Sequence, residues 1–180
     1  KDAKLIRYLA AHGHTSPFEH ISATFELTVP LFVARQIMRH RTFSFNEVSR
    51  RYTSKGLTVY QPKEIRRQAE TNLQCSSDEL PDDLDHCRAL FNSSAATSMA
   101  IYNELIARGV SRETARLVLP VSLYTSFWMS GNLHNWVKFV RLRTTEHVQL
   151  ETRLAAEAIK MQLLERFPIS VKALLDDEYE

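Results

Sequence analysis

The chain has 180 residues, of which 44% are hydrophobic and 24% charged, the balance of an ordinary globular protein with one sizeable core. The formal net charge is only +2, so bulk electrostatics gives no support for a polycationic protein that binds nucleic acid. No apolar run approaches the roughly 20 residues of a membrane span, and no stretch has the pattern of a signal peptide. We therefore expect a cytoplasmic protein with no membrane partner.

The N-terminal segment predicts a helix and then a strand. Residues 1–10 place Leu5, Ile6 and Leu9 on one helical face. Residues 22–29 alternate strictly between polar and apolar side chains, which is typical of a strand with one buried face.

A short basic helix is expected next. Pro30 ends the strand and suits the first turn of a helix over about residues 31–39, which is apolar early and basic late. The end of this helix delivers an arginine-rich segment into a loop. Short strands are then expected at 51–53 and 57–60, around Gly56.

The remainder of the chain predicts helices around one further strand. Apolar residues at three- and four-residue steps favour a long helix at the start of this region, and Asn132 is a good N-cap for a later one. The expected elements are a helix over 78–108, a short helix over 112–119, a strand over 121–129, a helix over 133–142 and a last helix over 145–167. No repeat or linker interrupts this succession, so we expect one α+β domain spanning residues 1–180.

The sequence does not support a metal site or a disulfide. Cys75 and Cys87 lie twelve positions apart, in no metal-ligand spacing, and free, buried thiols are the default for a cytosolic protein. The histidines have no metal-ligand spacing relative to one another either.

Residues 39–51 are the segment with the most hydrogen-bonding groups. It holds four arginines, one histidine, one glutamate, one asparagine and two serines. Guanidinium groups grip phosphate and carboxylate through two parallel hydrogen bonds, so this inventory suits a phosphorylated nucleoside. The alternative is a solvated basic loop. The chain has only 4 glycines and neither a Walker loop nor GxGxxG, so a bound dinucleotide must be held by side chains.

Other candidate residues have plausible structural roles. Gln36 and Arg39 are three positions apart and share a helical face with each other. Glu47 could contact a ligand or simply balance an arginine. Arg116 and Arg143 are single arginines near helix ends, where such residues more often have a structural role.

The arginine-rich segment resembles a known family. RHRTFSFNEVSRRY is similar to the RHRxxSxNExSxRY signature of the flavin-dependent thymidylate synthases, the ThyX family. The resemblance extends in order over essentially the whole chain, through HGHTSPFEHISATFEL, PLFVARQ, SRETARLVLPVSLYT and RLRTTEHVQLE. The matching motif positions are Arg39, His40, Arg41, Ser44, Asn46, Glu47, Ser49, Arg51 and Tyr52.

The resemblance implies a fold, an assembly and a reaction. Members of the family have helices packed on an antiparallel sheet and form homotetramers whose active sites are shared between subunits. They convert dUMP to dTMP, with methylenetetrahydrofolate as carbon donor, reduced FAD as hydride source and NADPH as reductant of the flavin. The family also carries a strand and a helix before the point where this chain starts, and we expect them to be missing here.

The resemblance also assigns roles to individual residues. The implied dUMP contacts are Gln36, Arg39, Glu47, Ser49, Arg50, Arg51, Arg116 and Arg143. The implied FAD contacts are Ser16, Arg39, His40, Arg41, Glu47, Asn132, His134, Lys138 and His147. His14 and Tyr52 are expected near the flavin and folate. Position 50 is often glycine in the family, and position 138 is commonly asparagine or histidine rather than lysine.

The expected chemistry does not use a cysteine nucleophile. Methylation of a uracil carbon needs electron density on that carbon, and neither cysteine neighbours the arginine-rich segment. Arg143, placed at the pyrimidine by resemblance, would act as the catalytic residue by stabilising negative charge that develops on the ring.

The sequence is also compatible with two other functions. One is an impaired family member that forms oligomers and binds nucleotide without turnover. The other is a nucleic-acid-binding module, but acidic residues at 78–85 and at 176–180 offset the basic segment and disfavour it.

Overall fold

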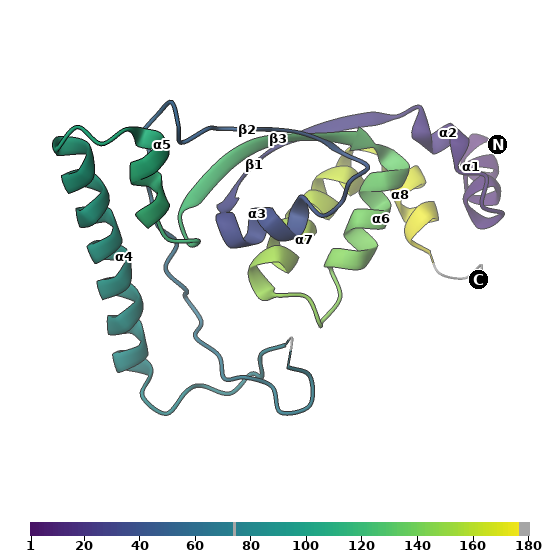
Figure 1. Ribbon diagram of the computed structural model, residues 1–180. Coiled ribbons are helices and arrows are strands. Elements are labelled where there is room, and N and C mark those ends of the chain that lie inside the picture. The colour runs from purple at the N-terminus through teal and green to yellow at the C-terminus, as the bar shows by residue number, and fades with distance from the viewer. Residues whose placement is uncertain (74, 177–180) are drawn as a thin grey trace. The chain divides into compact units, whose positions relative to one another are not determined.

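A computed structural model describes residues 1–73 and 75–176. Most of the acidic tail at 176–180 therefore lies outside the described residues. Contacts divide the chain into two compact units, whose elements are labelled in Figure 1. Unit 1 comprises Lys1–Leu27, Gln36–Asn46 and Phe127–Glu180, and unit 2 comprises Thr28–Arg35 and Glu47–Ser126.

The named strands form one antiparallel sheet in the order β1-β3-β2. Their bounds are Ser22–Pro30 for β1, Ser44–Glu47 for β2 and Tyr124–Asn132 for β3. The hydroxyls of Thr24 and Ser130 lie 2.8 Å apart, as do those of Thr28 and Ser126. Because four steps forward on β1 match four steps back on β3, these two strands run in opposite directions.

The strict alternation of β1 is present in the structure. Glu26 and Thr28 are exposed, whereas Leu27 and Val29 are buried. The prediction of a strand with one buried face is therefore confirmed, and its physical basis is the period of two along an extended chain.

The core of unit 1 is built around Trp136. This unit contains α1 (Asp2–Ala11), α2 (Ser16–Glu19), α6 (Leu133–Arg143), α7 (Leu150–Arg166) and α8 (Pro168–Leu175). Trp136 is fully buried, and its indole N–H donates to the backbone oxygen of Ala23 at 3.1 Å. The rings of Phe25 and Phe43 meet Trp136 edge-on, so α6 is fixed against the inner face of the strands in this unit.

Gly131 leaves room in this core for the ring of Phe43, the residue that precedes β2. A Cβ added at Gly131 on β3 would overlap the ring of Phe43, which is itself packed on Trp136 and Phe139. Glycine is thus required here for packing, because any side chain would displace the ring.

Unit 2 is built from one long helix and two short ones. These are α4 (Leu84–Ala107), α5 (Arg112–Ala115) and the 3-10 helix η1 (Arg116–Val118). The carboxylate of Asp83 accepts a hydrogen bond from His86 N at 3.0 Å and caps α4. Gly109 ends α4 with φ +84°, a conformation that glycine adopts readily. α3 (Leu31–Ile37) contributes Leu31–Arg35 to unit 2 and its last two residues to unit 1.

Several predicted boundaries need correction. The expected strands at 51–53 and 57–60 are absent from the described residues, where only Val59 forms an isolated bridge with Leu123. Residues 44–47, expected as loop, form β2. The last helix begins later than predicted, at Leu150, and the long helix begins at Leu84 rather than 78.

The two cysteines agree only in part with the expectation of buried thiols. Neither Cys75 nor Cys87 forms a disulfide within the described residues, and both are half-buried rather than fully buried. In the described part of the chain, no three acidic, histidine or cysteine side chains group as metal ligands would. None of the helices in that part has the length and apolar character that crossing a bilayer requires.

Candidate functional site

A cavity in unit 2 brings four of the expected nucleotide residues together. We call it the β3 cavity, and its volume is about 270 Å³. The four expected residues in its wall are Glu47, Ser49, Arg50 and Arg116. The remaining lining residues are Leu31, Val48, Leu119, Leu123 and Thr125. A partly apolar wall with two guanidinium groups and a hydroxyl fits an anionic ligand that carries a ring.

The carboxylate of Glu47 is held in place from β3. Glu47 is the last residue of β2, and the hydroxyl of Thr125 donates to its Oε1 at 2.6 Å. Thr125 is 2% exposed, so its position is fixed by packing. The second oxygen of the Glu47 carboxylate can accept a hydrogen bond from a ligand.

Arg50 holds the loop that follows the arginine-rich segment. Its guanidinium donates to the backbone oxygen of Lys55 at 2.7 Å and to that of Tyr124 at 3.2 Å. Its Nε is buried and, within the described part of the chain, meets no hydrogen-bond acceptor. A buried donor without an acceptor costs free energy on the order of 1–3 kcal/mol, and a ligand in the β3 cavity could remove that cost.

Two expected residues of this unit do not line the β3 cavity. Arg51 forms a salt bridge of 3.1 Å with Glu113, and about half of each side chain is exposed. Tyr52 is 79% exposed. Surface ion pairs of this kind contribute little to stability, so Arg51 can exchange its partner for a ligand at low cost.

Unit 1 contains a second group of expected residues, centred on Arg143. Its Nε donates to Nε2 of His40 at 2.9 Å, and its Nη2 donates to the backbone oxygen of Gln36 at 3.0 Å. These bonds use two of the five N–H donors of the guanidinium, and the other three can meet a ligand. We call this group the Arg143 network. It consists of Gln36, His40 and Arg143, together with Gln149 and Thr152, which bond to the side chain of Gln36.

The neutral form of His40 suits its place in this network. Burial lowers the pKa of His40, and the positive charge of Arg143 lowers it further. Since Nε2 accepts the hydrogen bond from Arg143, the neutral ring carries its proton on Nδ1. The ring also packs edge-on against Phe139, which restricts its rotation.

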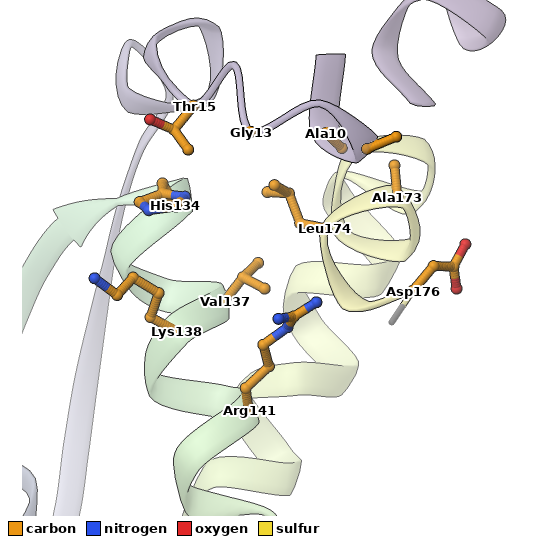
Figure 2. Close-up of a pocket in the computed structure, with 11 residues that line it drawn as sticks. Ala10, Gly13, Thr15, His134, Val137, Lys138, Arg141, Ala173, Leu174 and Asp176 are labelled. Atoms are coloured by element: carbon orange, nitrogen blue, oxygen red, sulfur yellow. The ribbon is translucent and has the colours of Figure 1, made fainter. Parts of the chain in front are cut away.

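A pocket on α6 brings together two of the expected flavin residues, His134 and Lys138. We call it the α6 pocket, and its volume is about 220 Å³. Figure 2 shows His134, Lys138 and Arg141 along one side of α6, opposite Leu174 of α8 and the connection at Thr15. Two cationic side chains and a histidine, with apolar groups and the single carboxylate of Asp176 beside them, can hold an anion attached to a larger ring system.

Burial and the charges around the α6 pocket lower the pKa of His134, which favours its neutral form. Burial is the largest cause of its lowered pKa, and Lys138 and Arg141 lower the pKa further, while Glu19 opposes them. A neutral imidazole offers one donor and one acceptor to a ligand.

Apart from Glu47, which lines the β3 cavity, the other expected flavin residues lie in unit 1 and line neither the β3 cavity nor the α6 pocket. Asn132 caps α6, with its Oδ1 accepting from Asn135 N at 2.9 Å. His147 is exposed and lies 3.5 Å from the Glu146 carboxylate. The remaining expected residues are all exposed: His14, Ser16, Arg39 and Arg41.

Three residues that hold the expected ones in place were not predicted from the sequence: Gln149, Thr152 and Thr125. Gln36 donates through Nε2 to Gln149 Oε1 at 2.6 Å and accepts through Oε1 from the hydroxyl of Thr152 at 3.1 Å. Gln149 lies in the stretch RLRTTEHVQLE, so a signal for it was present. Thr152 and Thr125 lie inside a helix and a strand, and only their long-range partners distinguish them from ordinary packing residues.

Comparison with known proteins identifies the family. The family model described as "Thymidylate synthase complementing protein" matches residues 1–169. The chain belongs to this family. A flavin-dependent thymidylate synthase from Thermus thermophilus is 42% identical over 170 residues, which are 94% of this chain and 62% of that relative. A flavin-dependent thymidylate synthase from Thermosipho africanus is 40% identical over 182 residues, covering 100% of this chain and 79% of the relative.

Two solved structures share the fold of this chain. A UMP/dUMP methylase, PolB from Streptomyces cacaoi bound with 5-Br dUMP, matches 95% of this chain and 77% of its own with TM-score 0.86 and 34% identity. The same methylase bound with 5-Br UMP matches with TM-score 0.89 over 96% of this chain and 82% of its own. The expected mixture of helices and an antiparallel sheet is therefore confirmed, whereas the chain spans only 62% of the length of the Thermus relatives.

Proposed function

We propose that this protein is a flavin-dependent thymidylate synthase that converts dUMP to dTMP. The observation that carries the proposal is the β3 cavity, in which Glu47, Ser49, Arg50 and Arg116 meet. The proposal includes methylenetetrahydrofolate as carbon donor and NADPH as reductant. It also includes a homotetramer whose active sites are shared between subunits, and action in the cytoplasm.

The β3 cavity supplies groups of the kind that a nucleotide needs. Arg116 and the hydroxyl of Ser49 suit the phosphate, and the buried Nε of Arg50 supplies one more donor. The free oxygen of Glu47 suits a sugar hydroxyl or a ring N–H, because an ionised carboxylate is an acceptor only. The structural neighbours were solved with bromo-dUMP and bromo-UMP, which supports a pyrimidine nucleotide as the ligand.

The α6 pocket has the chemistry that a flavin dinucleotide requires. Lys138 and Arg141 would face the diphosphate, and Val137 and Leu174 would pack against an apolar part of the cofactor. When bound, FAD supplies the hydride, which no protein side chain can supply.

Arg143 is the proposed catalytic residue. Its guanidinium stays charged at neutral pH, although burial lowers its pKa. His40 and the backbone of Gln36 fix its position before any ligand arrives. A charge held in place where negative charge develops on the pyrimidine lowers the barrier without reorganisation during the reaction. No cysteine lines the β3 cavity, which favours this route over a thiolate nucleophile.

Turnover by the full-length protein tests the reaction directly. We expect dTMP, detected by mass spectrometry, when flavin-loaded protein is incubated with dUMP, methylenetetrahydrofolate and NADPH. Arg143→Ala should abolish product formation while flavin content is retained. A flavin-loaded wild-type protein that forms no dTMP would refute the activity and favour the alternative of an impaired member that only binds nucleotide.

A nucleotide titration tests the β3 cavity separately. Arg116→Ala should weaken dUMP binding by roughly 10- to 150-fold, because a hydrogen bond to a charged group contributes about 1.5–3 kcal/mol. Arg108→Ala is the matched control, since Arg108 pairs with Glu104 on an exposed helix end and lies outside the cavity wall. Equal dUMP affinity in both variants, measured by calorimetry, would rule out the β3 cavity as the nucleotide site.

A further inference from the structure

The side chain of Gln36 is held at both ends by the first turn of α7. Its Nε2 donates to Gln149, the N-cap residue of α7, and its Oε1 accepts from the hydroxyl of Thr152. An amide group has one donor end and one acceptor end, so these two contacts together define which way it points. Neither Gln149 nor Thr152 lines the β3 cavity or the α6 pocket.

Thr152 is the buried member of this pair. Its side chain is fully buried, whereas Gln149 is exposed. A threonine hydroxyl in or next to a helix commonly bonds to the backbone oxygen four residues earlier. Thr144 does so in the same unit, donating to Val140 O at 2.8 Å. The hydroxyl of Thr152 instead reaches a side chain that is 116 positions away in sequence.

Gln36 also connects this contact to Arg143. Its backbone oxygen accepts from Nη2 of Arg143, so one residue joins the end of α6 to the start of α7. When the hydroxyl of Thr152 is present, the free lone pair of Oε1 and the free hydrogen of Nε2 point in fixed directions. Without it, the amide can rotate about its last torsion, which has a broad energy profile.

We propose that Thr152 is a positioning residue for substrate binding, which sets the orientation of the Gln36 amide with the help of Gln149. This inference rests on the proposed function, to which it adds the contact between Gln36 and dUMP that the family resemblance implies. Thr152 does not touch the nucleotide and acts only through Gln36. Loss of the Thr152 hydroxyl lowers the fraction of molecules in which the Gln36 amide has the orientation that binds dUMP. The apparent affinity for dUMP falls in proportion to that fraction.

The decisive comparison is between Thr152→Val and Thr152→Ser in the flavin-loaded, full-length protein. Valine keeps the shape and removes the hydroxyl, whereas serine keeps the hydroxyl. We expect Thr152→Val to raise KM and Kd for dUMP roughly three- to tenfold, the size of one neutral hydrogen bond, with kcat within about twofold of wild type. Thr152→Ser should restore KM and Kd to near the wild-type values.

Two further measurements separate positioning from a loss of stability. Thr24→Val removes another inter-residue hydroxyl bond, to Ser130, and should leave KM for dUMP unchanged. In a Gln36→Ala background, Thr152→Val should have no additional effect on dUMP affinity, because the two changes remove the same interaction. An unchanged KM in Thr152→Val, a loss in Thr152→Ser of the same size, or additive effects in the double variant would each overturn the inference. A wild-type protein that does not bind dUMP would overturn the proposed function and this inference together.

Discussion

Arg50 shows how a single residue can serve the fold and the cavity together. Two of its hydrogen bonds go to backbone oxygens of Lys55 and Tyr124, which fixes the loop against β3. Its Nε is left as a buried donor in the described structure. The terminal nitrogens of this guanidinium therefore hold the loop, while its Nε remains for a ligand. The sequence alone could not show which nitrogens of the guanidinium bond to the loop and which one stays available.

His40 makes the stability of the folded protein depend on pH. Burial and Arg143 lower its pKa in the folded protein below the ordinary histidine value of about 6.5. The unfolded chain therefore takes up more protons than the folded chain as the pH falls below about 6.5. Stability is unaffected by this group at higher pH, and it decreases as the pH falls from there towards the folded pKa.

The pH prediction can be checked by urea unfolding at pH 7.5 and 5.5, at one fixed protein concentration. We expect wild type to lose more free energy of unfolding between these two pH values than His40→Gln does, because glutamine does not titrate. His20→Gln, an exposed histidine for comparison, should behave like wild type. The same loss in His40→Gln as in wild type would mean that the acid sensitivity arises elsewhere, for example at His134, whose pKa is lowered too.

At the scale of elements, Asn132 is the residue on which the start of α6 depends. Its Oδ1 accepts from Asn135 N at 2.9 Å, which satisfies one of the free N–H groups in the first turn. α6 provides Trp136 to the core and His134 and Lys138 to the α6 pocket. A loss at this cap therefore affects both the packing and the pocket.

We expect Asn132→Ala to lower the free energy of unfolding by about 1 kcal/mol, the usual value of an N-cap. Asn132→Ser keeps a capping oxygen and should retain most of the stability. Ser111→Ala at the start of α5 should cost less, because the Ser111 hydroxyl bonds to the Thr114 side chain and caps no backbone N–H. Chemical denaturation of the three variants measures these differences, and no difference between Asn132→Ala and wild type would argue against the capping role.

The helices and strands that could be predicted from the sequence are those with local signals. β1 and α6 were predicted closely, because strict alternation and an N-cap asparagine are local signals. The start of α4 was not, because several acidic residues before it could serve as caps and only Asp83 does. β2 was missed although Phe43 and Phe45 alternate with polar residues, because its pairing partner β3 lies about 80 positions away.

The candidate site was predictable in composition but not in arrangement. The family resemblance named Glu47, Ser49 and Arg116, and all three line the β3 cavity. It could not show that Arg51 pairs with Glu113 instead, since surface ion pairs depend on three-dimensional neighbours. The supporting contacts of Thr125 and Thr152 are long-range for the same reason.

At the scale of the whole molecule, α4 has more apolar surface than its own unit covers. Of its 24 residues only Ala95 and Tyr102 are buried. Leu90 and Ile101, which are 57% and 45% exposed, are eleven positions apart and therefore share one helical face. Exposed apolar faces of this kind mark interaction surfaces, and the homotetramer that belongs to the proposed function would cover this one.

Assembly of the full-length protein tests this role of α4. We expect wild type to sediment as a tetramer, and the double variant Leu90→Glu with Ile101→Glu to sediment as a smaller species across a range of concentrations. The reason is that two carboxylates buried without partners in an apolar interface cost more than such a contact can offset. Leu5→Glu is the control, because Leu5 is also exposed, at 56%, but belongs to α1. A double variant that still forms tetramers would move the interface away from this face of α4, and a monomeric wild type would contradict the proposed assembly itself.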